Sequence, residues 1–347
     1  MTDFTSKVCR KCSLALIFML FLQSTYSQQD FTALDAIIAK NQKALGKDLV
    51  VAINKEGKNI FLKETDELKL KTPAPIASCS KWLTAALVMI FVDEGKINLD
   101  EPLATYIPLF EKNMKGYITL RNCLSHTTGL DVGPSGVLKL AQRSKFNSLE
   151  EEIVFFATKK EIIDNPGQAF AYSGVGLNIA GRVIEIVSKK SFDRVITEKL
   201  FRPLGMKTAT FYNDNGGAIN PSAGAICSAF DYLNFMQMIL NKGMFNGKRI
   251  LSERAIDEMM KTQTLDMRVR STPESGKGLN YALGSWIQED ENGRGTVFTS
   301  PGAFGTWPWI DTKRNYVGII FAKSLLGEQK KELYLRMKET ADNAIDQ

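Results

Sequence analysis

The distribution of strand-like segments most constrains how this chain can fold, because they lie at both ends and leave the middle to helices. Near the start, two apolar runs at 48–54 and 59–63 flank Glu56-Gly57-Lys58, which is typical of a hairpin. Further strand-like runs follow late in the chain, at 281–288, 296–300, 306–310 and 316–323. We therefore expect one α/β domain assembled from the two ends, with a helical part inserted between them.

The middle of the chain contains a succession of helix starts. Serines suited to cap a helix precede several of its segments, namely Ser148, Ser191, Ser228 and Ser252. A nearly continuous apolar stretch at 82–92 follows Ser78 and ends at Gly95, so we expect a helix that is buried on most sides. Amphipathic helices are predicted near the two ends, at 31–46 and 328–345.

The first 27 residues have the order of a secretory signal peptide. Basic residues up to Lys11 precede an apolar run from Cys12 to Leu22, and small residues follow before Ser27. The alternative, an uncleaved anchor, is less favoured because the run is too short to span a bilayer comfortably. We therefore expect a secreted or periplasmic protein, cleaved after Ser27, whose mature chain of residues 28–347 has no membrane span.

Composition excludes several classes of function. Of the formal charge of +6, the leader's three basic residues and one acidic residue contribute +2, which leaves +4 on the mature chain. Its Lys and Arg are scattered and form no basic stripe, so we expect no nucleic-acid partner. One histidine and three mature cysteines exclude the usual zinc sites, and phosphate-binding glycine motifs are missing. We expect no metal, no cofactor and no structural disulfide.

Ser78-Cys79-Ser80-Lys81, at the start of the expected buried helix, contains a candidate catalytic pair. Three residues make about one helical turn, so the Ser78 hydroxyl and the Lys81 amine can reach one another. A hydroxyl becomes a good nucleophile only when a base removes its proton, and lysine serves as that base when desolvation and nearby positive charge lower its pKa. Two alternatives are that Ser78 is only a helix cap and that Ser80 is the nucleophile.

Several further motifs lie in one order along the chain with this pair, namely Val92–Pro102, Leu124–Leu130, Pro166–Gly174, Pro203–Met206 and Ala223–Asp231. Together they resemble the serine β-lactamase-related superfamily, nearest to class C β-lactamases, serine esterases of that fold and D-alanyl-D-alanine carboxypeptidases. The resemblance implies an antiparallel sheet flanked by helices, with an all-helical insertion at about 78–274 between α/β parts at about 28–77 and 275–347.

The resemblance implies roles for other residues. Tyr172 matches a tyrosine that works with the lysine as base or proton shuttle, although it could also be a core aromatic. Ser300, Gly302 and Ala303 match the third motif, where the amide of Ala303 would join that of Ser78 in an oxyanion hole. His126 lies in a turn that is structural in the resembled family, which disfavours a Ser-His-Asp triad.

Two positions depart from the family pattern. Gly174 stands where a substrate-contacting Asn is usual, and Ser300 stands where a cation is usual. Losing that cation should weaken the binding of a substrate carboxylate by roughly 1.5–3 kcal/mol. We therefore expect a monomeric, exported serine hydrolase that acts through a Ser78 acyl-enzyme on ester, amide or β-lactam carbonyls of a small-molecule or peptide substrate. The alternative is a catalytically impaired, penicillin-binding-like protein that binds peptidoglycan fragments or β-lactams.

Overall fold

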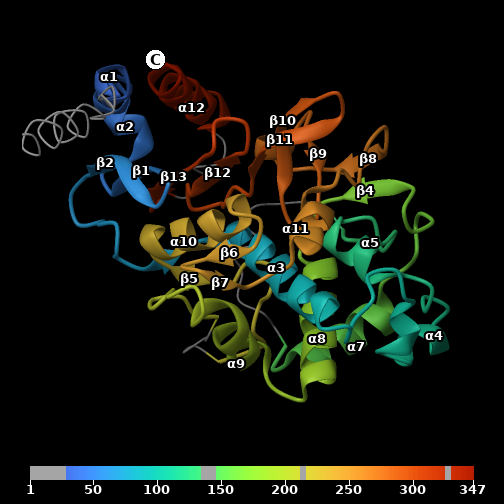
Figure 1. Cartoon of the computed structure of the whole chain (residues 1–347). Helices are drawn as coiled ribbons and strands as arrows, with labels where there is room; N and C mark the ends of the chain where they lie inside the picture. The colour runs from blue at the N-terminus through green and yellow to red at the C-terminus, as the bar shows by residue number, and fades with distance from the viewer. Residues whose placement is uncertain (1–28, 134–145, 212–215, 325–329) are drawn as a thin grey trace, which may run out of the picture.

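An antiparallel sheet forms the centre of the protein, which is described here from a computed structural model (Figure 1). The structure describes residues 29–133, 146–211, 216–324 and 330–347. The strands of the sheet, in spatial order, are β2 (Lys58–Glu64), β1 (Leu49–Lys55), β13 (Tyr316–Ala322), β12 (Trp307–Asp311), β11 (Arg294–Thr299), β10 (Trp286–Glu291) and β9 (Asn280–Tyr281).

The two ends of the chain meet inside this sheet. Strand β1 pairs antiparallel with β13, with a register that runs from Leu49 opposite Ala322 to Asn54 opposite Val317. The predicted fold class, an α/β structure with an antiparallel sheet flanked by helices, is therefore confirmed. The boundaries of the helical insertion at 78–274 stay a prediction.

The central strands β1, β12 and β13 are buried on both faces of the sheet, because successive side chains point to opposite faces and each face is covered. In β1, Val50 and Ala52 face one hydrophobic cluster, whereas Leu49, Val51 and Ile53 face another. Figure 1 shows the helices that cover these faces. The first cluster includes residues of α3 (Ser80–Asp93) and α10 (Ala229–Leu240), and the second includes residues of α1 (Thr32–Lys40) and α12 (Lys331–Ile345).

The residues of α3 from Ser80 to Phe91 are all buried, as the apolar stretch predicts. Short strands form three small sheets, which pair β3 (Ala74–Pro75) with β5 (Ile226–Cys227), β4 (Ala169–Ala171) with β8 (Arg268–Ser271), and β6 (Met244–Phe245) with β7 (Lys248–Arg249). The other helices are α2 (Gln42–Leu45), α4 (Leu109–Lys112), α5 (Leu120–Leu124), α7 (Leu149–Lys159), α8 (Val175–Ser188), α9 (Phe192–Ile196) and α11 (Glu253–Met260).

Two sequence predictions need correction. The strand expected at 281–288 is broken into β9 and β10, because the chain turns at 282–285 with a hydrogen bond from the Ala282 amide to the Ser285 carbonyl. The helix expected at 31–46 is two helices, α1 and α2, that meet at Asn41. The predicted signal peptide at 1–27 lies outside the described residues. Among those residues, every helix is too short or too polar to cross a membrane.

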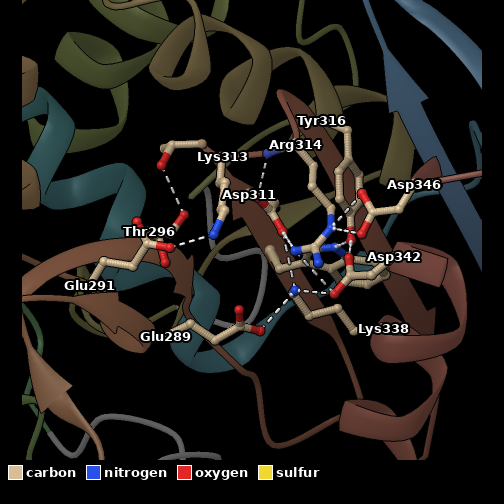
Figure 2. Close-up of polar contacts among 12 residues, drawn as sticks. Glu289, Glu291, Thr296, Asp311, Lys313, Arg314, Tyr316, Lys338, Asp342 and Asp346 are labelled. Carbon is tan, nitrogen blue, oxygen red and sulfur yellow. Dashed lines mark hydrogen bonds and ion pairs between the residues drawn. The ribbon is translucent and has the colours of Figure 1, made fainter.

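Buried charges attach α12 to the sheet (Figure 2). The Lys338 amine, only 2% exposed, lies 2.7 Å from a carboxylate oxygen of Asp342 and 3.2 Å from one of Asp311. The Tyr316 hydroxyl donates to Asp342 at 2.6 Å, and Arg314 contacts Asp311 at 3.1 Å. Burial acts to lower the pKa of Lys338, but its carboxylate partners outweigh burial and raise the pKa. The network therefore depends on the Lys338 charge.

We predict that Lys338→Met lowers the free energy of unfolding by about 3 kcal/mol, because it removes one of the two cations, Lys338 and Arg314, that face the buried carboxylates of Asp311 and Asp342. Urea unfolding measures the change. Lys313→Met is the matched control, since Lys313 pairs with Glu291 and both side chains are well exposed, and it should stay close to wild type. Equal losses from the two variants would contradict the importance assigned to the buried network.

Candidate active site

Ser78 lies in a single tight turn, Ala77–Cys79, that leads directly into α3. Ala77 has a φ of 45°, a left-handed backbone conformation that is uncommon for a residue with a side chain and costs about 1–2 kcal/mol. The residue at the cap position of α3 is Cys79, and no side chain caps this end of the helix. The Ser78 hydroxyl is therefore not used as a helix cap.

The Lys81 amine faces Ser78 from inside the protein. Lys81 is 0% exposed, and its Nζ lies 3.2 Å from the Ser78 Oγ and 3.0 Å from the carbonyl oxygen of Ser222. A buried amine needs hydrogen-bond partners because burying it unpaired costs several kcal/mol. Ser222 supplies such a partner from a segment far away in the sequence.

The segment that contains Ser222 is attached to α3 by two hydroxyls. The Thr84 hydroxyl donates to the Pro221 carbonyl at 2.7 Å. The Ser80 hydroxyl accepts from the Ala225 amide at 3.0 Å and donates to the Ala77 carbonyl at 2.6 Å. Since Ser80 is occupied on both sides by the main chain, the geometry favours Ser78 over Ser80 as the nucleophile.

Tyr172 lies beside the lysine, between β4 and α8. The Lys81 Nζ is 4.7 Å from the centre of the Tyr172 ring, and the ring is 6% exposed. Its neighbours are aromatic: His126 at 4.5 Å and Trp286 at 5.3 Å between ring centres. The structure thus brings together Ser78, Lys81 and Tyr172, the three residues predicted to be catalytic.

His126 is buried beside Tyr172, and its two ring nitrogens have other partners. Its Nδ1 accepts from the Ser173 amide at 3.4 Å, so the proton lies on Nε2, which is 3.2 Å from the Tyr281 hydroxyl. Burial, together with the nearby Lys81, lowers the pKa of His126 well below its usual value. A neutral histidine used in this way supports the packing of Tyr172 and is not the base of a Ser-His-Asp triad.

The predicted third motif lies on the other side of Ser78. A Cβ added to Gly302 would be 2.2 Å from the Ile76 carbonyl oxygen, so only glycine lets the two backbones approach so closely. Ala303 follows and is fully buried, and its amide donates no hydrogen bond within the described residues. The Ser300 hydroxyl points to main-chain carbonyls, 3.3 Å from that of Gly284 and 3.5 Å from that of Ser78. In the described part of the chain, no cluster of side chains is arranged to hold a metal ion.

Comparisons with known proteins agree with this architecture. The family model described as Beta-lactamase matches residues 34–342. The chain belongs to the beta-lactamase family. Members of this family are serine hydrolases. Protein flp of Staphylococcus aureus (strain MW2) is 29% identical over 147 residues, which cover 42% of this chain but only 29% of that protein's length.

Two solved structures are similar over most of their length. A candidate beta-lactamase from Bacteroides dorei DSM 17855 superposes with a TM-score of 0.80 at 26% identity, over 92% of this chain and 100% of that one. A family VIII carboxylesterase superposes with a TM-score of 0.75 at 19% identity, over 90% of this chain and 97% of that one. The second comparison supports the fold alone.

In this beta-lactamase-family protein, the glycine at position 174, where the family usually has Asn, lies against the Ser222 hydroxyl. A Cβ added to Gly174 would lie 2.5 Å from the Ser222 Oγ. The Ser222 hydroxyl therefore occupies the space into which a side chain at 174 would extend, and it donates to Asn220 at 2.7 Å. Sequence reasoning missed Ser222, although the matched motif at Ala223–Asp231 begins immediately after it.

We predict that the stability contributed by His126 falls as the pH falls. The folded protein keeps the ring neutral, whereas the unfolded chain takes up a proton below its ordinary pKa of about 6.5. Wild type should therefore lose up to about 1.4 kcal/mol per pH unit relative to His126→Asn below that pH. Asn is chosen because His126 has a φ of 60°. Urea unfolding of both proteins between about pH 8 and pH 5 measures the difference, in which other titrating groups cancel. A constant difference would contradict the buried neutral histidine.

We also predict a specific coupling between residues 174 and 222. Gly174→Ala should destabilise the protein by about 1–3 kcal/mol, because the new methyl group meets the Ser222 hydroxyl. The backbone is no obstacle, since Gly174 has a φ of −85°. Adding Ser222→Ala removes that hydroxyl, so the double variant should be more stable than the two single losses imply. Additive free energies of unfolding would show that the two positions do not compete for space.

Proposed function

We propose that this protein is an exported serine hydrolase that forms an acyl-enzyme at Ser78. The supporting observation is the buried Lys81 amine, 3.2 Å from the Ser78 hydroxyl and anchored by the Ser222 carbonyl. Such a pair is suited to removing the hydroxyl proton as the oxygen attacks a carbonyl. Export is supported by the order of residues 1–27, and amino-terminal sequencing of extracellular or periplasmic protein, expected to begin at Gln28, tests it.

The reaction would proceed in two halves. Lys81 accepts the proton of Ser78 while the Ser78 Oγ bonds to the carbonyl carbon of the substrate. The amides of Ser78 and Ala303 stabilise the oxyanion that forms. Collapse of this intermediate breaks the bond to the leaving group, which takes up a proton delivered through Lys81 or Tyr172. Water then attacks the acyl carbonyl, and the proton returns to Ser78 as the acid leaves.

Neutral esters or amides fit the site better than substrates with a carboxylate. The Ser300 hydroxyl, which replaces the family's cation, donates to carbonyls of the protein itself. The chain also shares its fold with a family VIII carboxylesterase. A β-lactam or a peptide ending in D-alanine carries a carboxylate that would meet no cation from this motif.

The second candidate is a penicillin-binding-like protein with impaired turnover. The observation that favours it is Ser222, whose hydroxyl lies 2.5 Å from the place of a Cβ at position 174, so the family's substrate-contacting Asn would clash with it there. A novel penicillin-binding protein homologue from Caulobacter crescentus shares this fold at 16% identity. Peptidoglycan fragments or β-lactams would be its ligands. The predicted monomeric state applies to both candidates and stays a prediction.

We predict that the wild-type protein hydrolyses a short-chain p-nitrophenyl ester and that Ser78→Ala loses at least about a thousandfold of this activity. The ester should be turned over faster than a chromogenic cephalosporin, because the cephalosporin carries a carboxylate. Release of p-nitrophenolate and opening of the cephalosporin are followed by absorbance. Unfolding in urea should be similar for the two proteins, which separates chemistry from folding.

A fluorescent penicillin distinguishes the second candidate. Stable labelling of Ser78 without ester turnover would favour the penicillin-binding-like function, and efficient cephalosporin turnover would overturn the preference for neutral substrates. An ester activity that survives in Ser78→Ala, or no reaction with any of the three probes, would contradict an acyl-enzyme at Ser78.

A further inference from the structure

A continuous series of hydrogen bonds connects the candidate nucleophile to helices outside the family motifs. It starts at the Ser78 Oγ, 3.2 Å from the Lys81 amine, and passes to the Ser222 carbonyl at 3.0 Å. The amide of Ser222 then donates to the Oδ1 of Asn178 at 3.1 Å. The Nδ2 of Asn178 donates to the Oε2 of Glu152, also at 3.1 Å.

The side-chain amide of Asn178 has one orientation because its two ends have different partners. A carboxylate only accepts and a main-chain amide only donates, so the nitrogen must face Glu152 and the oxygen must face Ser222. Asn178 is 5% exposed, and its own main-chain amide donates to the Gly174 carbonyl in the first turn of α8. The side chain of Asn178 is therefore held in one conformation.

Asn178 connects the two sides of the site. Its helix, α8, begins directly after Tyr172 and Gly174, whereas its oxygen binds the residue whose carbonyl contacts Lys81. The position of the lysine is thereby coupled to that of the tyrosine. Catalytic groups lose activity steeply when displaced, by as much as about a hundredfold for 1 Å.

We propose that Asn178 is a positioning residue, which with Glu152 as its anchor holds Ser222 so that the Ser222 carbonyl fixes the Lys81 amine against Ser78. Asn178 does not touch the reacting atoms. Three other contacts hold the same loop. Within it, the Oδ1 of Asn220 also accepts from the Ser222 amide at 3.1 Å, and from α3, Thr84 binds the Pro221 carbonyl and Ser80 accepts from the Ala225 amide. The loop is therefore expected to stay folded without Asn178, but to lose its hydrogen bond to the side chain on α8.

The inference rests on the proposed function. A fluorophosphonate probe tests the Ser78 nucleophile and the positioning role of Asn178 separately. The Ser78 oxygen bonds to phosphorus, the phosphorus–fluorine bond breaks, fluoride leaves, and the hydroxyl proton goes to Lys81. Labelling of the wild type but not of Ser78→Ala would establish the nucleophile without any natural substrate. Burial raises the pKa of Glu152 to about 7, so the assays belong at about pH 8, where its carboxylate is ionised.

We predict that Asn178→Leu lowers the rate of labelling and the kcat for the p-nitrophenyl ester about tenfold or more, with little change in KM. The reason is that the lysine is displaced while the walls that bind substrate stay in place. Asn234→Leu is the matched control, because Asn234 also donates from a helix to a carbonyl, that of Leu204, and it should react like wild type.

The pair Asn178→Asp with Glu152→Gln tests the geometry itself. The Asp accepts from the Ser222 amide and from the new Gln amide, so all contacts re-form with the donor reversed. Asn178→Asp alone places two carboxylates together and should react slowly at about pH 8, and adding Glu152→Gln should restore most of the rate.

Each outcome bears on a different claim. An unlabelled wild type would overturn the proposed function. A labelled wild type with an unchanged rate in Asn178→Leu would overturn the positioning role. The positioning role would also be overturned if the activity of Asn178→Leu fell only in proportion to the amount of folded protein. A double variant, Asn178→Asp with Glu152→Gln, that reacted no faster than Asn178→Asp alone would overturn it as well, because the re-formed contacts should restore the rate.

Discussion

A lysine amine that is shut away from water is the constraint on which the arrangement of this site depends. Lys81 is fully buried on the central helix α3, where an amine without acceptors would be strongly unfavourable. It must therefore find oxygen atoms, and it finds the hydroxyl of Ser78 and the carbonyl of Ser222. The hydrogen bonds that make burial of the Lys81 amine tolerable thus also place it where it can take a proton from Ser78.

This constraint also explains why residues distant in the sequence had to converge. Ser80 and Thr84, one position before and three after Lys81, bind the loop that contains Ser222. Helix α8 binds that loop from the other side through Asn178. Helix α3 also shares one hydrophobic cluster with the sheet that the two end segments build, so the sheet supports the helix that carries the amine. A substitution in the loop or in α3 is therefore expected to change the position of the Lys81 amine relative to Ser78.

Local patterns made the framework predictable from the sequence. The serine caps at 148, 228 and 252 accept hydrogen bonds as expected, whereas Ser191 makes no such bond. The one-turn spacing of Ser78 and Lys81 required only helix geometry. The roles of Ser222 and Asn178 could not be predicted, since each depends on contacts between segments far apart. The turn at 282–285 also depends on such contacts, because the amides of Leu283 and Gly284 donate to the carbonyls of Met259 and Leu124. A weak signal for Asn178 existed, a polar residue on the buried side of a helix just after Tyr172.

The two departures from the family pattern have a common physical consequence. At Gly174 the missing side chain is replaced by a hydroxyl of the loop that holds Lys81, and at Ser300 the missing cation is replaced by a hydroxyl that donates to main-chain carbonyls. In both cases a group that would contact substrate gives way to one that bonds within the protein. We infer that such changes remove polar recognition of the substrate, while the contact between Ser78 and Lys81 is kept. Selectivity would then depend on the shape and apolar character of the acyl group, which favours neutral esters over charged β-lactams.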